Sequence, residues 1–279
     1  MPFRCTPGMK DPVKTLAYEP WKIAVKAFQV SPRTWYVAGQ TWVGCYLIDS
    51  GDGCILLDTA IPESLYMLID GIYQSGHKPS DIKAIFLSHA HFDHIGGAAA
   101  MKALTGAPIY MSEEDTKFMA ECPKETMLLD PDSHPQVFTV DRFYHDDTPI
   151  RMGDIEIRTV LTPGHTIGCT SFFWKEKNPA SGDVYTVAMH GGVGANTMND
   201  QYYASSAYLT PDLRERFFAD APKIAAMSVD IALPSHPNQI EILDRAGTYT
   251  HESQPYLDST VWADFIKERV RQVKVLMNR

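Results

Sequence analysis

The chain of 279 residues lacks the long apolar stretches that mark membrane and exported proteins. No run of about 18 apolar residues occurs, so no membrane-spanning helix is expected. The first residues, Met-Pro-Phe-Arg-Cys-Thr, do not lead into the apolar core of a secretory signal. We therefore expect a soluble, cytoplasmic protein that has no membrane partner.

An excess of positive charge is also absent. The 25 lysines and arginines stand against 34 acidic residues, which gives a formal net charge of −9. Because binding the phosphates of a nucleic acid requires a basic face, no nucleic-acid partner is expected. A small-molecule substrate remains the expected partner, and the sequence leaves the oligomeric state open.

Cysteine is scarce and has no redox or metal-binding spacing. The five cysteines, an odd number, include no Cys-x-x-Cys pair, so free or buried thiols in a reducing compartment are expected. A cysteine nucleophile is a competing chemistry, but Cys169 has no catalytic partners in view. The fingerprints of Gly-x-Ser-x-Gly hydrolases, P-loop proteins and dinucleotide-binding enzymes are missing as well.

What the sequence does contain is a dense cluster of metal-competent side chains. Residues 88–94 read Ser-His-Ala-His-Phe-Asp-His, directly behind an apolar run that predicts a short buried strand. If the chain stays extended past this strand, His89 and His91 point to the same side and can bind one cation. Asp93 and His94 follow where a turn into a helix would aim them at a second position. At this chain's His and Asp frequencies the pattern arises by chance in roughly 10⁻³ of sequences, so it predicts metal binding.

Two later histidines follow predicted strands in the same way. His165 stands in Thr-Pro-Gly-His-Thr, and His236 stands in Pro-Ser-His-Pro. Strand ends hold ligands accurately, because rigid elements give way to loops there. The predicted ligands are His89, His91 and His165 for one metal, and Asp93, His94 and His236 for the other.

Three neutral imidazoles suit zinc and leave its fourth position open for water, which is typical of a catalytic site. We therefore predict two zinc ions per chain that share a hydroxide, the nucleophile of the reaction. Asp93 would ligate one ion and orient the hydroxide.

Short strand patterns alternate with helical ones, which predicts an α/β layer structure. We predict a single domain over 1–279, with an N-terminal extension at 1–20 and an amphipathic C-terminal helix at 259–277. Periodicity fades at 123–147, so a long loop is predicted there, acting as a lid or wall beside the metals. The other predicted strands are 24–30, 34–37, 43–48, 55–58, 84–87, 108–111, a hairpin at 150–161, 169–174, 184–189 and 229–233, and the other predicted helices are 62–73, 98–104, 113–122 and 211–227.

The His-x-His-x-Asp-His run after a strand, the later Pro-Gly-His-Thr and the late strand-end histidine resemble the metallo-β-lactamase superfamily. The resemblance covers nearly the whole chain. It implies an αβ/βα four-layer sandwich, in which two sheets lie face to face with helices outside and the metals at the edge of the sheets. It also implies the same two sets of metal ligands that the spacing predicts.

One departure narrows the resemblance. Many superfamily hydrolases, such as glyoxalase II and the lactonases, carry a metal-bridging Asp after the strand that follows Pro-Gly-His. Here that strand ends in Ala-Met-His-Gly-Gly at 188–192, and Asp183 precedes it. In lacking this metal-bridging Asp the chain resembles subclass B3 β-lactamases, and the segment 212–236 resembles that subclass as well. In place of their substrate-side serines stands His190, which either reaches a metal or a substrate carboxylate or is packed in the interior.

The resemblance thus implies a binuclear zinc hydrolase that opens the amide bond of a lactam. Alternatives are hydrolysis of a lactone, ester or thioester, and, less favoured, a metal-binding oxidoreductase. A superfamily nuclease is disfavoured by the acidic composition, and a non-catalytic metal-binding protein is the last alternative.

Overall fold

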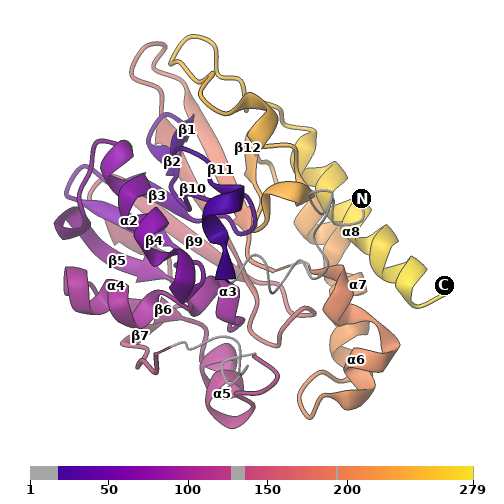
Figure 1. Ribbon diagram of the computed structural model, residues 1–279. Coiled ribbons are helices and arrows are strands. Elements are labelled where there is room, and N and C mark those ends of the chain that lie inside the picture. The colour runs from indigo at the N-terminus through magenta and orange to yellow at the C-terminus, as the bar shows by residue number, and fades with distance from the viewer. Residues whose placement is uncertain (1–17, 127–135, 193, 279) are drawn as a thin grey trace.

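The computed structural model describes residues 18–126, 136–192 and 194–278. Its strands form two mixed sheets that lie face to face (Figure 1). None of the helices in these ranges is long and apolar enough to cross a lipid bilayer.

The first sheet has seven strands in chain order, β1 (Phe28–Ser31), β2 (Thr34–Tyr36), β3 (Tyr46–Asp49), β4 (Cys54–Leu57), β5 (Ile82–Phe86), β6 (Ile109–Met111) and β7 (Arg142–Phe143). Neighbours from β1 to β4 run antiparallel, and those from β4 to β7 run parallel. The parallel part requires crossover helices, which are α2 (Leu65–Gln74), α4 (Ala98–Thr105) and α5 (Glu113–Glu121).

The second sheet has the order β12 (Ile231–Leu233), β11 (Val184–His190), β10 (Thr170–Lys177), β9 (Ile155–Leu161) and β8 (Ile150–Met152). Its pairs are antiparallel except for β11 with β12. The turn between β8 and β9 needs Gly153, whose φ is +53°, because a Cβ there would lie 2.2 Å from the carbonyl oxygen of Ser50.

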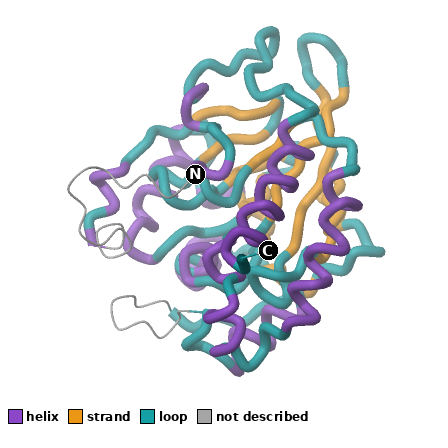
Figure 2. The backbone as a smooth tube through the Cα atoms, turned by 90° about the vertical axis from the view of Figure 1, so that its right-hand side faces the viewer, coloured by secondary structure: helices purple, strands orange, loops and turns teal. Residues whose placement is uncertain are grey.

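Successive side chains of β10 point into two different apolar layers, one on each face of the second sheet, as the two-residue period of a strand requires. Phe172 packs between the sheets with Phe86 and Tyr144, while the neighbouring Phe173 packs outward against Trp262. The helices α7 (Pro211–Ala225) and α8 (Val261–Leu276) cover the outer face of the second sheet. Figure 2 shows these helices in front of the strands, which completes the four layers.

A buried carboxylate joins the sheets at one end. Glu176 of β10 is 1% exposed and accepts hydrogen bonds from Ser31 Oγ at 2.7 Å, from the Arg33 backbone N–H at 2.6 Å and from Trp174 Nε1 at 2.6 Å. Burying a carboxylate is unfavourable unless it is paired or hydrogen-bonded, and these donors supply that pairing. The β1–β2 turn is thereby fixed to the second sheet.

The predicted α/β four-layer sandwich is confirmed, while several boundaries differ from the prediction. The strand expected at 24–30 begins only at Phe28, and Ala24 forms an isolated bridge with Gln40 instead. The short helix α6 (Asp200–Ser205) was not predicted; Asn199 caps it by accepting from the Tyr202 backbone N–H at 2.8 Å.

The long segment 123–147 is only partly a loop. Its residues 127–135 lie outside the described residues, as do 1–17 of the predicted N-terminal extension. Arg142–Phe143 adds β7 to the first sheet, and Tyr144 is buried, its hydroxyl donating to the Leu87 carbonyl at 2.8 Å. This part of the segment therefore belongs to the packed structure. The described cysteines, Cys45, Cys54, Cys122 and Cys169, are free thiols, and Cys5 lies outside the described residues.

Candidate metal centre

The histidine-rich motif lies where β5 gives way to the short helix α3 (Phe92–Ile95). Ser88, His89 and Ala90 form bends rather than the extended continuation that the sequence analysis assumed. The rings of His89 and His91 still come together, with centroids 4.9 Å apart. Gly97 ends the motif, and a Cβ there would lie 2.4 Å from the Thr59 carbonyl oxygen, so only glycine permits this close approach.

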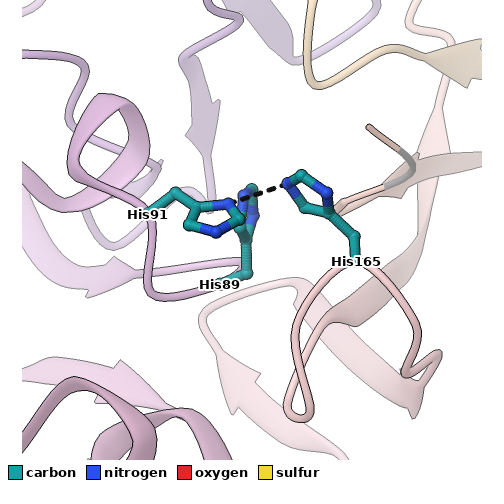
Figure 3. Close-up of side chains that lie close together, drawn as sticks. All are labelled: His89, His91 and His165. Atoms are coloured by element: carbon teal, nitrogen blue, oxygen red, sulfur yellow. Dashed lines mark hydrogen bonds between the residues drawn. The ribbon is translucent and has the colours of Figure 1, made fainter. Parts of the chain in front are cut away.

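The first group of potential ligands consists of His89, His91 and His165. One ligand atom from each lies within 4.8 Å of the others, and all three residues are buried. Nδ1 of His91 lies 2.8 Å from Nε2 of His165, although the two residues are 74 positions apart in the chain. Figure 3 shows the three rings converging on one point from two loops.

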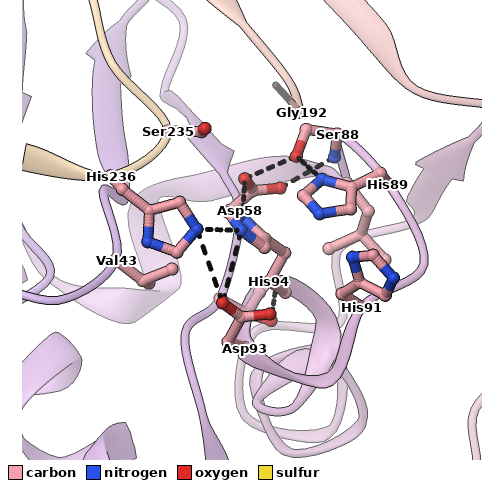
Figure 4. Close-up of polar contacts among 12 residues, drawn as sticks. Val43, Asp58, Ser88, His89, His91, Asp93, His94, Gly192, Ser235 and His236 are labelled. Atoms are coloured by element: carbon pink, nitrogen blue, oxygen red, sulfur yellow. Dashed lines mark hydrogen bonds and ion pairs between the residues drawn. The ribbon is translucent and has the colours of Figure 1, made fainter. Parts of the chain in front are cut away.

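The second group consists of Asp93, His94 and His236. Their ligand atoms also lie within 4.8 Å of one another. Nε2 of His94 lies 3.3 Å from Nε2 of His236, and Oδ2 of Asp93 lies 3.7 Å and 3.5 Å from these two nitrogens. Figure 4 shows the group beside His89 and His91, so the two groups are neighbours.

The outer nitrogens of the imidazoles are held by protein oxygens. Nδ1 of His165 donates to the Gly194 carbonyl at 3.0 Å, and Nδ1 of His236 donates to the Trp42 carbonyl at 2.8 Å. A carbonyl can only accept, so Nδ1 carries the proton in both rings and the lone pair of Nε2 faces the site. Thr197 Oγ1 makes a further contact with Nδ1 of His165.

Asp58 supports one ring of each group and was not identified from the sequence. Its Oδ2 accepts from Nδ1 of His94 at 2.7 Å and from Ser88 Oγ at 2.7 Å, and Ser88 Oγ in turn lies 3.0 Å from Nδ1 of His89 (Figure 4). Burial raises the pKa of Asp58 to about 7, although the Ser88 hydrogen bonds oppose this shift. The signal in the sequence was an Asp directly behind the apolar strand β4, the same placement that singled out the histidines.

A second buried carboxylate connects the loops that carry the first group. Asp115 accepts from the Ala90 backbone N–H at 2.8 Å, from Thr166 Oγ1 at 2.6 Å and from the Gly168 backbone N–H at 2.7 Å. Ala90 lies between two of the histidines, and Thr166 follows His165. Asp115 therefore fixes the distance between the two loops.

Burial also determines the protonation state of the imidazoles. Desolvation, with the neighbouring imidazoles adding to it, lowers the pKa of His89 and of His165 well below the usual range. For the same reasons the pKa of His91 falls to about 3, and so does that of His94, where Asp93 opposes the shift. These rings are neutral at neutral pH, which is the form that binds a metal.

These residues fit a pair of metal ions. Among the described residues, Nε2 of His89 is a buried polar atom without any hydrogen-bond partner, although it points into a group of other imidazoles. Such an orphaned atom is unfavourable unless something coordinates it. Neutral nitrogen donors with one carboxylate are the ligands that zinc takes in catalytic sites.

His190 lies apart from both groups. Its ring packs at 6.2 Å from the rings of Trp262 and Phe265, and its Nδ1 accepts from the Gly192 backbone N–H at 3.4 Å. The side chain therefore faces the layer between the second sheet and α8, which corresponds to the packed alternative in the sequence analysis.

Comparison with known families agrees with this geometry. The profile described as metallo-beta-lactamase superfamily matches residues 43–178, which include five of the six potential ligands. The chain is 26% identical to the probable metallo-hydrolase YqgX of Bacillus subtilis over 56% of this chain and 71% of that protein. It is 31% identical to the hydroxyacylglutathione hydrolase GloC of Haemophilus influenzae over 41% of this chain. It is 27% identical to the N-acyl homoserine lactonase AiiA of Bacillus thuringiensis over 50% of this chain. The chain spans only 53% of GloC and 60% of AiiA.

Solved structures match over nearly the whole chain. The subclass B3 metallo-beta-lactamase BJP-1 of Bradyrhizobium japonicum aligns with a TM-score of 0.78 and 26% identity, covering 93% of this chain and 99% of that one. The metallo-beta-lactamase FEZ-1 of Legionella gormanii aligns with a TM-score of 0.78 and 27% identity, covering 91% and 95%.

The fold and the two ligand groups therefore define a metallo-β-lactamase-type hydrolase with a His-rich site for metal ions. The chain belongs to the metallo-β-lactamase superfamily, and it is structurally similar to subclass B3 enzymes.

Proposed function

We propose that this protein is a binuclear zinc hydrolase, and that the bond it opens is the strained amide of a β-lactam. The observation that carries the proposal is the pair of neighbouring ligand groups, His89–His91–His165 and Asp93–His94–His236, each within 4.8 Å. Zinc ions bound there would supply a hydroxide nucleophile at neutral pH and polarise the carbonyl of the substrate.

The residues of the chain contribute position and protonation state. The buried, neutral imidazoles offer lone pairs without first having to release a proton, because burial has already lowered their pKa values. Asp93 is the one carboxylate among the six proposed ligands, and its Oδ2 faces Nε2 of both His94 and His236. We propose that Asp93 also orients the nucleophile, since a carboxylate can accept its proton as a hydrogen bond.

The end of β11 supports a lactam over a lactone or thioester. Many lactonases and glyoxalases of the superfamily carry a metal-bridging Asp at this point. Here β11 ends at His190, and Gly191 and Gly192 follow. Asp183 lies at the other end of the strand and cannot substitute. The packed His190 is not part of the proposed substrate site.

A lactone, ester or thioester hydrolase is the alternative. It is supported by the sequence similarity to a lactonase and to a hydroxyacylglutathione hydrolase, each over half or less of this chain.

A substrate panel tests the proposal. Protein with its metal content measured would be assayed against a chromogenic cephalosporin, a carbapenem, an N-acyl homoserine lactone and a glutathione thioester. We expect turnover of the lactam, and we expect a chelator to abolish it. Asp93→Ala should reduce this turnover by about 100-fold or more, the size of effect expected when a side chain positioned at a reacting proton is removed. Turnover of the lactone or thioester alone would support the alternative, and turnover of none would reject the hydrolase.

A further inference from the structure

One buried arginine contacts three points of the segment that leads from β11 to α7. Arg214 of α7 is 7% exposed, and its Nη1 donates to the Met198 carbonyl at 3.0 Å. Its Nη2 forms an ion pair with Oδ1 of Asp200 at 2.7 Å, and its guanidinium carbon lies 4.7 Å from the centre of the Tyr203 ring. The guanidinium therefore attaches segment 194–203 to α7.

The same segment contacts the loop that carries His165. The Gly194 carbonyl accepts from Nδ1 of His165 at 3.0 Å, and Thr197 Oγ1 also contacts this nitrogen. Because Nδ1 is a donor, the hydroxyl accepts from it, and it donates its own proton to the Gly194 carbonyl at 3.2 Å. Tyr203 Oη donates to the carbonyl of Gly164, the residue before His165. Both oxygens that hold the outer nitrogen of His165 thus belong to the segment that Arg214 contacts.

The segment and the His165 loop are in close contact. A Cβ at Gly164 would lie 2.8 Å from Cε of Met198, and a Cβ at Gly194 would lie 2.4 Å from Cε1 of His165. A shift of the segment would therefore displace the imidazole or move the two oxygens away from its Nδ1.

The burial of Arg214 is explained better by positioning than by stability. A buried ion pair adds little net stability, because the loss of hydration offsets the attraction, and here the Asp200 side chain is 65% exposed. Nε of Arg214 is buried without a hydrogen-bond partner among the described residues, which is unfavourable. What the guanidinium does supply is a rigid planar fork that can hold the Met198 carbonyl and Asp200 at once.

We propose that Arg214 is a positioning residue of the metal centre. It fixes segment 194–203 to α7, so that the Gly194 carbonyl and the Thr197 hydroxyl stay on Nδ1 of His165. The lone pair of Nε2 is thereby kept pointing toward the first ligand group. The proposal rests on the metal site of the proposed function, although not on its substrate.

Cobalt binding tests the proposal, because Co²⁺ accepts the ligands of a zinc site and its visible absorption reports their geometry. The full chain, stripped of metal, would be titrated with Co²⁺ in competition with a chromophoric chelator. In Arg214→Met, which keeps an apolar stem and removes the guanidinium, we expect the affinity for one of the two ions to fall by about 10-fold and the absorption bands to change. The affinity for the other ion should stay the same, whereas a general loss of structure would lower both.

Arg216→Met is the matched control. Arg216 also lies on α7 and pairs with a carboxylate, that of Asp220, but its side chain is exposed, so neither affinity should change. Thr197→Val removes the hydroxyl at Nδ1 of His165. If Arg214 acts through this contact, Arg214→Met/Thr197→Val should lose less affinity than the two single variants together.

Circular dichroism would establish that Arg214→Met keeps its fold. If it does not, Asp200→Ala takes its place with the same expectation, since it removes only the exposed half of the ion pair. Unchanged cobalt affinity and absorption, equal losses for both ions, or additive losses with Thr197→Val would overturn the proposal and leave the proposed function intact. Absence of cobalt binding by the wild type would overturn both.

Discussion

Oδ2 of Asp58 lies 2.7 Å from Nδ1 of His94, and both side chains are fully buried. The same oxygen reaches His89 through the hydroxyl of Ser88. One carboxylate that is itself no member of either ligand group thus fixes the tautomer of one imidazole in each. Partners that orient metal-ligating imidazoles in this way typically contribute about 10–100-fold to metal affinity.

Replacing this carboxylate should weaken zinc binding. In Asp58→Asn the φ of +60° remains acceptable, since Asn tolerates the left-handed region, but one of the two accepting oxygens becomes an NH2 group. That group would face either the donors His94 Nδ1 and Ser88 Oγ or the Ser88 backbone N–H, and it can accept from none of them. We expect the affinity for zinc to fall by about 10–100-fold. Competition with a chromophoric chelator measures this, with the exposed Asp52→Asn as the control. Equal affinities would show that Asp58 has no supporting role.

Removing a ring from the first ligand group should reduce metal content and turnover together. His165→Ala deletes the nitrogen that lies 2.8 Å from Nδ1 of His91, and we expect zinc occupancy and hydrolysis to drop by about 10-fold or more. Elemental analysis and the substrate panel check this, and the exposed His145→Ala should change neither. Normal turnover by His165→Ala at matched metal content would contradict the ligand assignment.

Glu125 is expected to hold the segment 199–208 in place beside the loop that carries His165. Its carboxylate accepts from Ser206 Oγ and from the Ala207 backbone N–H, while Tyr203 of the same segment donates to the Gly164 carbonyl. In Glu125→Ala the amide of Ala207 should exchange hydrogen about 10-fold faster, because a hydrogen bond to a charged group is lost. Hydrogen-exchange mass spectrometry measures this, and Glu114→Ala on α5 serves as the control. Unchanged exchange in 199–208 would rule out this role.

The buried His190 should make stability sensitive to acid. Burial, with a contribution from the Arg269 guanidinium, lowers the pKa of His190 to about 3, whereas the unfolded chain titrates near 6.5. Between these values the unfolded state binds more protons, so stability is lost as the pH falls below about 6.5.

His190→Leu should therefore reduce the loss in the free energy of unfolding between pH 7 and pH 5 by about 2 kcal/mol. Urea unfolding at the two pH values, with a chelator in every sample, measures this. His145→Leu, at an exposed position, should keep the wild-type pH dependence. The same dependence in His190→Leu would mean that His190 is not buried and neutral.

The two groups of potential metal ligands could be predicted because local spacing and strand ends reveal them. His89, His91, Asp93 and His94 lie within six positions, and His165 and His236 each follow an apolar strand. The local reasoning was incomplete, since His89 stands in a bend rather than a strand. The helix α3 nevertheless turns Asp93 and His94 toward His236, as the sequence suggested.

The supporting carboxylates could not be predicted in the same way. Asp58 follows an apolar strand as the histidines do, but its contacts lie 30 and 36 positions away, and no local pattern encodes its supporting role. Asp115 stands three positions after Ser112, whose side chain caps α5, so it looks like an ordinary acidic residue in a first helical turn. Only the packing of the two sheets reveals that its carboxylate points inward.

Asp115 makes the folding of the two halves of the chain interdependent. Its partner Ala90 lies 25 positions before it in the first half, and its partners Thr166 and Gly168 lie 51 and 53 positions after it in the second half. If either half unfolded alone, an ionised group would remain in the interior with its donors gone, which is unfavourable. The two sheets should therefore fold and unfold as one cooperative unit. The two groups of potential ligands should accordingly be in place before any metal ion binds.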